Sequence, residues 1–188
     1  GASMGPVISS QALARIHKYI EDGENSGARL VLDGRSPKLP QSNQNGYFIG
    51  PTIFTDVMPT HRIAQEEIFG PVLSILRAGC IDSALKIVNS HSMGNGAVIF
   101  TQNSFYTEKF IEEAETGMIG VNVGICAPHP YMPFGGIKDS LVGNNKVQGQ
   151  DAIAFFTQNK AITLKTLHPT GALPLNSVNA DIKSCVAS

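Results

Sequence analysis

The sequence predicts an α/β fold, in which a mostly parallel sheet has flanking helices and is followed by a C-terminal strand and a tail. Short apolar runs of strand length alternate along the chain with segments whose apolar residues recur at helical spacing. The order strand, helix, strand, helix, strand is typical of βαβ units, which build parallel sheets. Hydrophobic residues make up 42% of the 188 residues, which is enough to fill the core of one such domain.

The first part of the chain is expected to contain one helix and three extended segments. Ser9 or Ser10 can cap a helix whose inner face repeats apolar residues at helical spacing. Residues 35–46 contain two prolines and three asparagine or glycine turn formers, and they predict a surface loop. The apolar residues of the helix are Leu13, Ile16 and Ile20. The extended segments are residues 28–32, 47–54 and 72–76.

Two further helices and two strands are expected in the middle of the chain. Asp82 or Ser83 can open one helix, and Asn103 or Ser104 can cap the next. Gly117 is placed to end the second of these helices in the left-handed conformation. The strands are residues 97–100 and 118–123, and a loop with three prolines follows over residues 124–136.

The chain is expected to divide into a start, one large domain, a strand and a tail. Residues 1–4 form the start, where Gly1-Ala2-Ser3 before Met4 looks like an expression remnant. Residues 5–152 form the domain. Apolar residues at 153–156 and 161–164 predict one long strand within residues 153–167. Residues 168–188 lose periodicity and are expected to be a tail, mostly disordered or loosely docked.

The segment from Gln65 to Val72 carries the clearest chemical signal in the chain. Glu66 and Glu67 precede an apolar pair and a Gly-Pro turn, which places them on a loop that feeds a strand. A carboxylate accepts two hydrogen bonds and donates none, so it suits the vicinal hydroxyls of a ribose. Phe69 offers a flat apolar face to a planar heterocycle. The alternative is a solvated acidic turn with Phe69 in the core.

Composition excludes several classes of partner. The net charge is −1 and no basic run is present, so nothing indicates nucleic acid or an anionic membrane surface. No apolar stretch approaches the length of a membrane span. The three cysteines are scattered without metal-ligand spacing, which fits free thiols in a reducing compartment and predicts no metal site.

Cys126 is the obvious candidate for a nucleophile, because it lies in a loop with His129 three residues further on. That spacing in a loop does not fix a thiol–imidazole hydrogen bond. The nearby sequence supplies no lysine or arginine before Lys138 to make the surroundings electropositive. A thiol enzyme built on Cys126 and His129 therefore stays as an alternative that the sequence disfavours.

The segment Gln65-Glu66-Glu67-Ile68-Phe69-Gly70-Pro71-Val72 closely resembles a hallmark of the aldehyde dehydrogenase superfamily, and the likeness extends over residues 5–167. Further segments match in kind and order: Gly5-Pro6-Val7-Ile8, Gly50-Pro51-Thr52-Ile53, Gly94-Asn95-Gly96, Gly120-Val121-Asn122 and Pro133-Phe134-Gly135-Gly136. Others are similar to the methylmalonate- or malonate-semialdehyde dehydrogenase branch: Leu32-Asp33-Gly34-Arg35, Gly94-Asn95-Gly96-Ala97, Gly120-Val121-Asn122-Val123, and Phe156-Thr157-Gln158 with Lys160. One segment is closer to the general family, Pro133-Phe134-Gly135-Gly136-Ile137-Lys138.

The resemblance implies a catalytic-domain fragment from the C-terminal end of an NAD-dependent semialdehyde dehydrogenase. Glu67 would bind the nicotinamide ribose hydroxyls, and Phe69 would pack beside the nicotinamide ring. The substrate pocket would include Asn122 and Cys126, with Phe134 as a wall. The family's nucleophilic cysteine and Rossmann domain would lie upstream, so the resemblance implies no catalytic residue in this chain and no activity for it alone.

The resemblance also implies partners. The substrate would be a small aldehyde, and coenzyme A is a possible second substrate. Residues 153–165 would form an oligomerisation strand of a homo-oligomer. The compartment would be the cytoplasm, or the mitochondrial matrix in a eukaryote. The alternative within this resemblance is a non-catalytic truncated paralogue that works as an assembly or interaction module.

Overall fold

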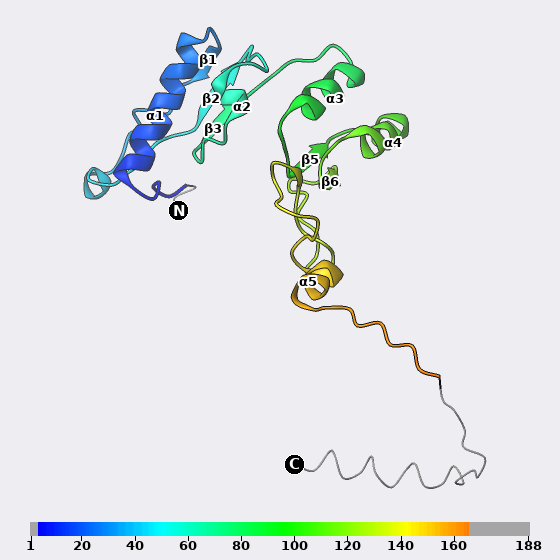
Figure 1. The fold of residues 1–188 in the computed structure, drawn as a ribbon. Coiled ribbons are helices and arrows are strands. Elements are labelled where there is room, and N and C mark those ends of the chain that lie inside the picture. Colours follow the sequence, from blue (N-terminus) through cyan, green and yellow to red (C-terminus); the bar gives the residue numbers. More distant parts are fainter. Residues whose placement is uncertain (1–3, 166–188) are drawn as a thin grey trace, which may run out of the picture. The chain divides into compact units, whose positions relative to one another are not determined.

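The computed structural model describes residues 4–165 (Figure 1). They divide between Phe155 and Phe156 into two units. The five α-helices of these residues are α1 (Ser10–Asn25), α2 (Arg62–Gln65), α3 (Ile81–Ser90), α4 (Ser104–Glu113) and α5 (Gly149–Phe156), with one 3₁₀ turn, η1 (Gln41–Asn43). The strands are β1 (Arg29–Leu32), β2 (Thr52–Thr55), β3 (Val72–Ser74), β4 (Met93–Gly94), β5 (Gly96–Ile99), β6 (Met118–Val121) and β7 (Ile137–Lys138).

Helix α1 begins and packs as the sequence predicts. Ser9 is its N-cap, and the Ser9 hydroxyl accepts a hydrogen bond of 3.1 Å from the Ala12 backbone N–H. Ile16 and Ile20, from the expected inner face, are fully buried in one core with Phe54 of β2. This core fixes the helix against the small sheet that leads to the Glu67 loop (Figure 1).

Within residues 4–165 the strands form three small sheets instead of one. In the first sheet β2 is central, antiparallel to β1 and parallel to β3. Strands β5 and β6 pair in parallel, and β4 pairs with β7 antiparallel. The fold is α/β as predicted, and two of these four pairings are parallel. The expectation of a single, mostly parallel sheet is therefore right only for β2–β3 and β5–β6.

The helices that follow confirm one predicted cap and correct two other expectations. Asn103 caps α4, and its side chain accepts a hydrogen bond from the Phe105 N–H at 2.9 Å. Helix α3 begins earlier than expected, because Cys80 is its N-cap and Ser83 completes a capping box. Gly117 is not left-handed. A Cβ there would overlap the backbone of Gly135 and Gly136, so close packing of two backbones explains the glycine.

The C-terminal strand predicted over residues 153–167 is wrong for all of its residues that the structure describes, 153–165. Residues 153–156 belong to helix α5, whose first turn holds Asp151. Residues 157–165 have neither helix nor strand structure. A carboxylate near a helix N-terminus is favourable, and Asp151 also accepts a hydrogen bond from the Lys146 backbone N–H at 3.1 Å. Residues 166–167 of the expected strand, and the tail predicted at 168–188, lie outside the described residues.

Candidate functional site

The loop between α2 and β3 holds two adjacent glutamates in different surroundings, and Glu66 is the one that is tied to the fold. The Tyr19 hydroxyl donates to one Glu66 oxygen at 2.6 Å, and the Arg62 Nε donates to the other at 2.9 Å. Arg62 also pairs with Asp22 at 2.7 Å and lies over the Tyr19 ring, 4.3 Å from its centroid. Glu66 therefore anchors the loop to helix α1.

These contacts shift the pKa values of the Glu66 carboxyl and the Tyr19 hydroxyl in opposite directions. The hydrogen bond from Arg62, and after it that from Tyr19, lower the pKa of the Glu66 carboxyl below its ordinary value. The same bond to Glu66, together with burial, raises the pKa of the Tyr19 hydroxyl. Both shifts favour the ionised carboxylate with a neutral phenol.

Glu67 has no such partner. Its side chain is exposed, and within residues 4–165 no group donates a hydrogen bond or an ion pair to its carboxylate. The two oxygens of Glu67 therefore remain available as acceptors, while the neighbouring Glu66 holds the loop in place. Contact of Glu67 with a ribose, which the family resemblance implies, stays a prediction.

Phe69 is presented to solvent by an unusual backbone. Its φ is +53°, in the left-handed region that bulky residues rarely adopt, and its side chain is 71% exposed. Its neighbour Ile68 is buried, and a Cβ on Gly70 would lie 2.6 Å from the Cδ1 of Ile16. The backbone on both sides is thus fixed against the core. The alternative that placed Phe69 in the core is wrong.

Glu67 lines an open cavity of about 500 Å³, which we call the Glu67 cavity. One wall consists of Gln65, Glu66 and Glu67, and the other consists of His91, Met93, Asn95, Asp139 and Ser140. A second cavity of about 380 Å³ is lined by four of the same residues, Gln65, His91, Met93 and Asn95, and by apolar residues that include Leu76 and Val88. Cavities of this size accommodate part of a drug-sized ligand.

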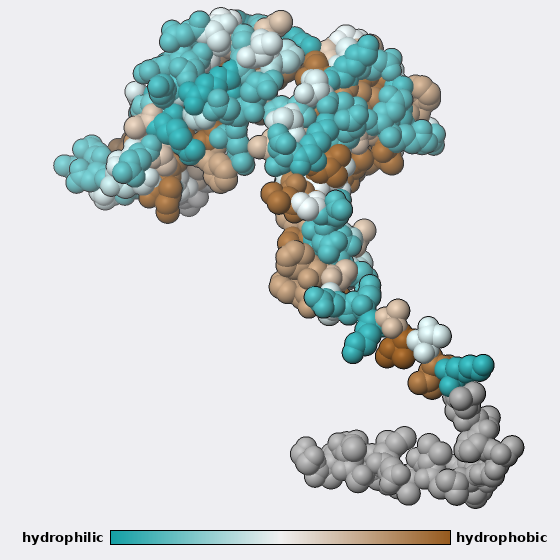
Figure 2. Space-filling model, viewed as in Figure 1, coloured by the Kyte–Doolittle hydropathy of each residue, from teal (hydrophilic) through white to brown (hydrophobic). Residues whose placement is uncertain are grey.

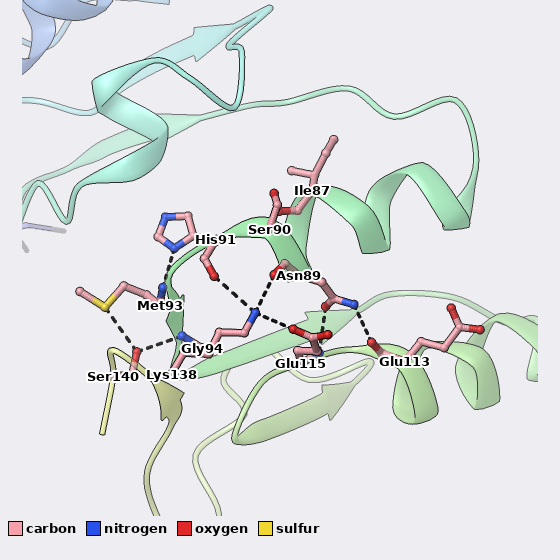
Figure 3. Close-up of polar contacts among 10 residues, drawn as sticks. All are labelled: Ile87, Asn89, Ser90, His91, Met93, Gly94, Glu113, Glu115, Lys138 and Ser140. Atoms are coloured by element: carbon pink, nitrogen blue, oxygen red, sulfur yellow. Dashed lines mark hydrogen bonds and ion pairs between the residues drawn. The ribbon is translucent and has the colours of Figure 1, made fainter. Parts of the chain in front are cut away.

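Hydrogen bonds join the two walls of the Glu67 cavity through His91. The Met93 N–H donates to the His91 Nδ1 at 3.0 Å, so the ring proton lies on Nε2. That nitrogen lies 3.1 Å from the Ala64 carbonyl in α2 and donates to it. Figure 3 shows the His91 ring beside Met93, and the Ser140 hydroxyl, which accepts from the Gly94 N–H at 3.1 Å.

Both polar atoms of the Asn122 side chain form hydrogen bonds with the backbone of Thr101. Its Oδ1 accepts from the Thr101 N–H at 2.9 Å, and its Nδ2 donates to the Thr101 carbonyl at 2.8 Å. Its φ is +54°, a conformation that asparagine tolerates better than most residues. Asn122 therefore joins the segments that follow β5 and β6, and it sets where the loop 124–136 begins.

Cys126 and Phe134 lie further along the same loop. Cys126 is a half-buried free thiol that packs over β5 and β6, since a Cβ on Gly96 would overlap its Sγ. Phe134 forms an isolated antiparallel bridge with Val147. Neither these two residues nor Asn122 lines the Glu67 cavity or the cavity beside it. Glu67 and Phe69 thus share one loop, of which Glu67 lines the Glu67 cavity and Phe69 does not, and the three predicted pocket residues lie elsewhere.

The alternative nucleophile finds no support in the geometry. The ring of His129 stacks on Tyr131, with centroids 5.6 Å apart and planes 5° apart. No hydrogen bond joins Cys126 to His129 in the part of the chain that the structure describes. The imidazole is engaged with an aromatic ring and not with the thiol.

From Met4 to Lys165, no three His, Cys, Asp or Glu side chains are grouped closely enough to hold a metal ion. None of the helices in that range combines the length and the apolar character needed to cross a bilayer.

Sequence reasoning missed the second wall of the Glu67 cavity. Its residues His91, Asn95, Asp139 and Ser140 come from segments far from Glu67 in the chain. One signal was available, because Asn95 lies between two glycines, and glycines mark close backbone approaches. A Cβ on Gly94 would lie 3.0 Å from Glu115 and from Ile137, which confirms such an approach.

Comparison with known proteins gives the chain a family. The model of the aldehyde dehydrogenase family matches residues 1–162. Malonate-semialdehyde dehydrogenase 2 of Oceanobacillus iheyensis is 43% identical over 165 residues, covering 88% of this chain and 34% of that protein. A Drosophila melanogaster protein assigned as an acylating, mitochondrial methylmalonate-semialdehyde/malonate-semialdehyde dehydrogenase is 45% identical, with 87% and 31% covered.

A solved structure agrees with these relatives. A Sinorhizobium meliloti 1021 protein assigned as a methylmalonate-semialdehyde dehydrogenase and complexed with NAD superposes with a TM-score of 0.86 at 42% identity, covering 91% of this chain and 35% of that one. The chain thus spans about a third of the length of the relatives it matches. Because the family model matches well over half of its residues, the chain belongs to the aldehyde dehydrogenase family.

Proposed function

We propose that this chain works as the C-terminal part of an NAD-dependent semialdehyde dehydrogenase that oxidises methylmalonate or malonate semialdehyde. One observation carries the proposal: Glu67 presents an unpartnered carboxylate to the Glu67 cavity, within the described residues, while Glu66 beside it is fixed. The names of the relatives support the substrate class. We propose residues 5–152 as the catalytic-domain portion, and 153–167 as a segment for subunit assembly.

The residues present fit the nicotinamide-ribose half of NAD. The free oxygens of Glu67 can accept hydrogen bonds from two ribose hydroxyls, and the exposed ring of Phe69 offers an apolar face to a planar ring. When bound, NAD supplies the hydride acceptor of the oxidation. The part of this chain is to hold and orient that half of the cofactor, with Glu66 keeping the loop rigid.

The aldehyde pocket is proposed at residues 122–134. Asn122 would shape this loop through its two hydrogen bonds to Thr101, Cys126 would line the pocket, and Phe134 would form a wall. We propose that no residue of this chain is the nucleophile, and that the chain alone does not oxidise aldehydes. Coenzyme A is proposed as a second substrate because the Drosophila relative is assigned as acylating.

A chimeric enzyme tests the proposal. The residues of the Oceanobacillus iheyensis relative that align with this chain are replaced by it, and NADH formation from malonate semialdehyde is followed by absorbance. The chimera should be active and the isolated chain inactive. Activity of the isolated chain, free of host enzyme, would contradict the division of roles.

Glu67→Gln in the chimera tests the site itself. The neutral amide holds ribose hydroxyls less strongly than the carboxylate, so kcat/KM for NAD should fall about tenfold or more. Glu112→Gln is the matched control, because Glu112 is also an exposed glutamate but lies on α4. Equal kinetics for the two variants would return Glu67 to the role of a solvated turn residue.

A second candidate function, a non-catalytic assembly module, is favoured by the exposed apolar surface. Figure 2 shows apolar residues, in brown, at the surface. Several large apolar side chains are more than half exposed, including Phe100, Ile125, Tyr131, Phe155 and Phe156. Exposed apolar surface of this kind marks contacts with other chains. An inactive chimera, combined with tight association of the isolated chain with itself or with that relative, would favour this candidate. We propose the cytoplasm or the mitochondrial matrix as the compartment in either case.

A further inference from the structure

We propose that Lys138 is a positioning residue for the Glu67 cavity, acting through His91 on the loop that carries Glu67. This inference rests on the proposed function for what the cavity binds, the nicotinamide nucleoside. The contacts that carry it belong to the described residues and do not depend on that function.

The ammonium group of Lys138 binds the C-terminal end of helix α3 and the residues that follow helix α4. Its Nζ donates to the Asn89 carbonyl at 2.6 Å and to the His91 carbonyl at 3.3 Å, and it pairs with Glu115 at 2.9 Å (Figure 3). An ammonium has three N–H donors, and here it meets three acceptors. Its side chain is 22% exposed, so water competes only weakly for these bonds.

The charge of Lys138 suits this place. Asn89 and His91 lie at the C-terminal end of helix α3, where carbonyl groups lack partners within the helix and the helix dipole is negative. Asn89 extends the cluster, because its side chain donates to the Glu113 carbonyl at 2.7 Å and accepts from the Glu115 N–H at 2.9 Å. Lys138 thus fixes the backbone on which the His91 ring is mounted.

The His91 ring passes this constraint to the opposite wall. With its Nδ1 accepting from Met93 and its Nε2 donating to Ala64, the ring has one tautomer and one orientation. Ala64 immediately precedes Gln65, which together with Glu66 and Glu67 forms the first wall. Lys138 is therefore connected to Glu67 through the His91 backbone and ring, the Ala64 carbonyl, and the three residues that follow Ala64.

Lys138 also fixes the second wall directly. It pairs with Met93 in the β4–β7 ladder, and its φ of +55° turns the chain so that Asp139 and Ser140 line the cavity. The Ser140 hydroxyl holds the Gly94 N–H, next to Asn95. One lysine thereby connects both walls of the site.

The first test reads the tautomer of His91 in the isolated chain, by the nitrogen chemical shifts of its imidazole in an NMR spectrum. In the unaltered chain the two ring nitrogens should show the separate shifts of an Nε2–H tautomer. Lys138→Met should release the His91 backbone and move both shifts toward their average. The matched control is Lys146→Met, which removes a half-buried lysine whose Nζ donates to the Gly117 carbonyl at 3.1 Å.

The second test uses the chimera. Lys138→Met should raise KM for NAD about fivefold while kcat changes less than about twofold, because the loop is displaced without loss of a reacting group. His91→Ala should give a similar rise, and the double variant should be no worse than the more affected single variant. Additive effects of the two changes would show that Lys138 does not act through His91.

The outcomes separate this inference from the proposed function. Unchanged His91 shifts in folded Lys138→Met overturn the inference, whatever the chimera does. A chimera without activity overturns the proposed function, while shifted His91 signals would still support the coupling. If Lys138→Met fails to fold, Glu115→Gln decides, because it weakens the ammonium cluster and leaves Lys138 in place. It should shift the His91 signals in the same direction, and unchanged signals would count against the coupling.

Discussion

At the scale of single residues, the loop after α2 divides two tasks between neighbouring glutamates. Both line the Glu67 cavity, but Glu66 accepts hydrogen bonds from Tyr19 and Arg62 and holds the loop, whereas the Glu67 carboxylate has no such partner within residues 4–165. A sequence that places two identical side chains in a row gives no sign of this difference. It arises because Tyr19, on another element, lies on one side of the loop.

The anchor predicts a loss of stability in acid. The folded state lowers the pKa of Glu66, and that of Asp33, which is hydrogen-bonded by Arg35, so both groups stabilise the fold when ionised. This stabilisation is present above their ordinary pKa values of 4.5 and 3.8 and is lost as the pH falls through the lower folded values. The urea midpoint should therefore fall as the pH is lowered from about 5 to about 2, by less in Glu66→Gln. An equal fall in that variant would show that Glu66 takes no part.

At the scale of elements, Gly70 joins the loop to the core. A Cβ there would lie 2.6 Å from the Cδ1 of the fully buried Ile16, which has no room to move aside. Gly70→Ala should therefore lower the free energy of unfolding by about 1–3 kcal/mol, as measured by urea denaturation. Gly79→Ala is the control, because nothing lies within 4 Å of a Cβ at that position. A loss of stability no larger than in the control would mean that helix α1 adjusts freely.

The positions of several helices could be predicted from the sequence. Capping residues and helical spacing locate α1 and α4, because those signals are local. The pairing of strands could not be predicted, since a strand's own pattern does not say which neighbour it meets. Residues 153–156 are a short apolar run, a pattern that fits a helix or a strand equally well. The carboxylate of Asp151 in the first turn, and its hydrogen bond from the Lys146 N–H, favour the helix.

The candidate site shows the same limit. The motif around Glu67 and Phe69 is contiguous, so its loop could be predicted, together with the acceptor and the ring. The second wall includes His91, Asn95 and Ser140, which only folding brings together. Lys138 could not have been singled out either, because its role depends on carbonyl groups of the backbone, which every sequence contains.

At the scale of the whole molecule, the exposed apolar side chains predict self-association. Ile162 and Leu164 are 75% and 81% exposed, in the segment proposed for assembly. The weight-average mass in sedimentation equilibrium should rise with concentration, and less so after Ile162→Glu with Leu164→Glu. Val142→Glu is the control, because Val142 is 99% exposed in another part of the chain. A monomer at all concentrations would show that these side chains do not recruit a second copy.

The backbone at Phe69 has a consequence for how such sites are recognised. A left-handed conformation would suit glycine or asparagine, and an exposed position would suit a polar side chain, yet a phenylalanine at φ +53° is 71% exposed. Strained backbone of this kind clusters at sites of function, so we propose that the Phe69 ring contacts a group outside the described residues. The coincidence of a bulky apolar side chain, positive φ and high exposure is therefore a criterion that can be applied to any structure. Residues that meet it are candidates for contacts with a ligand or with another part of a larger protein.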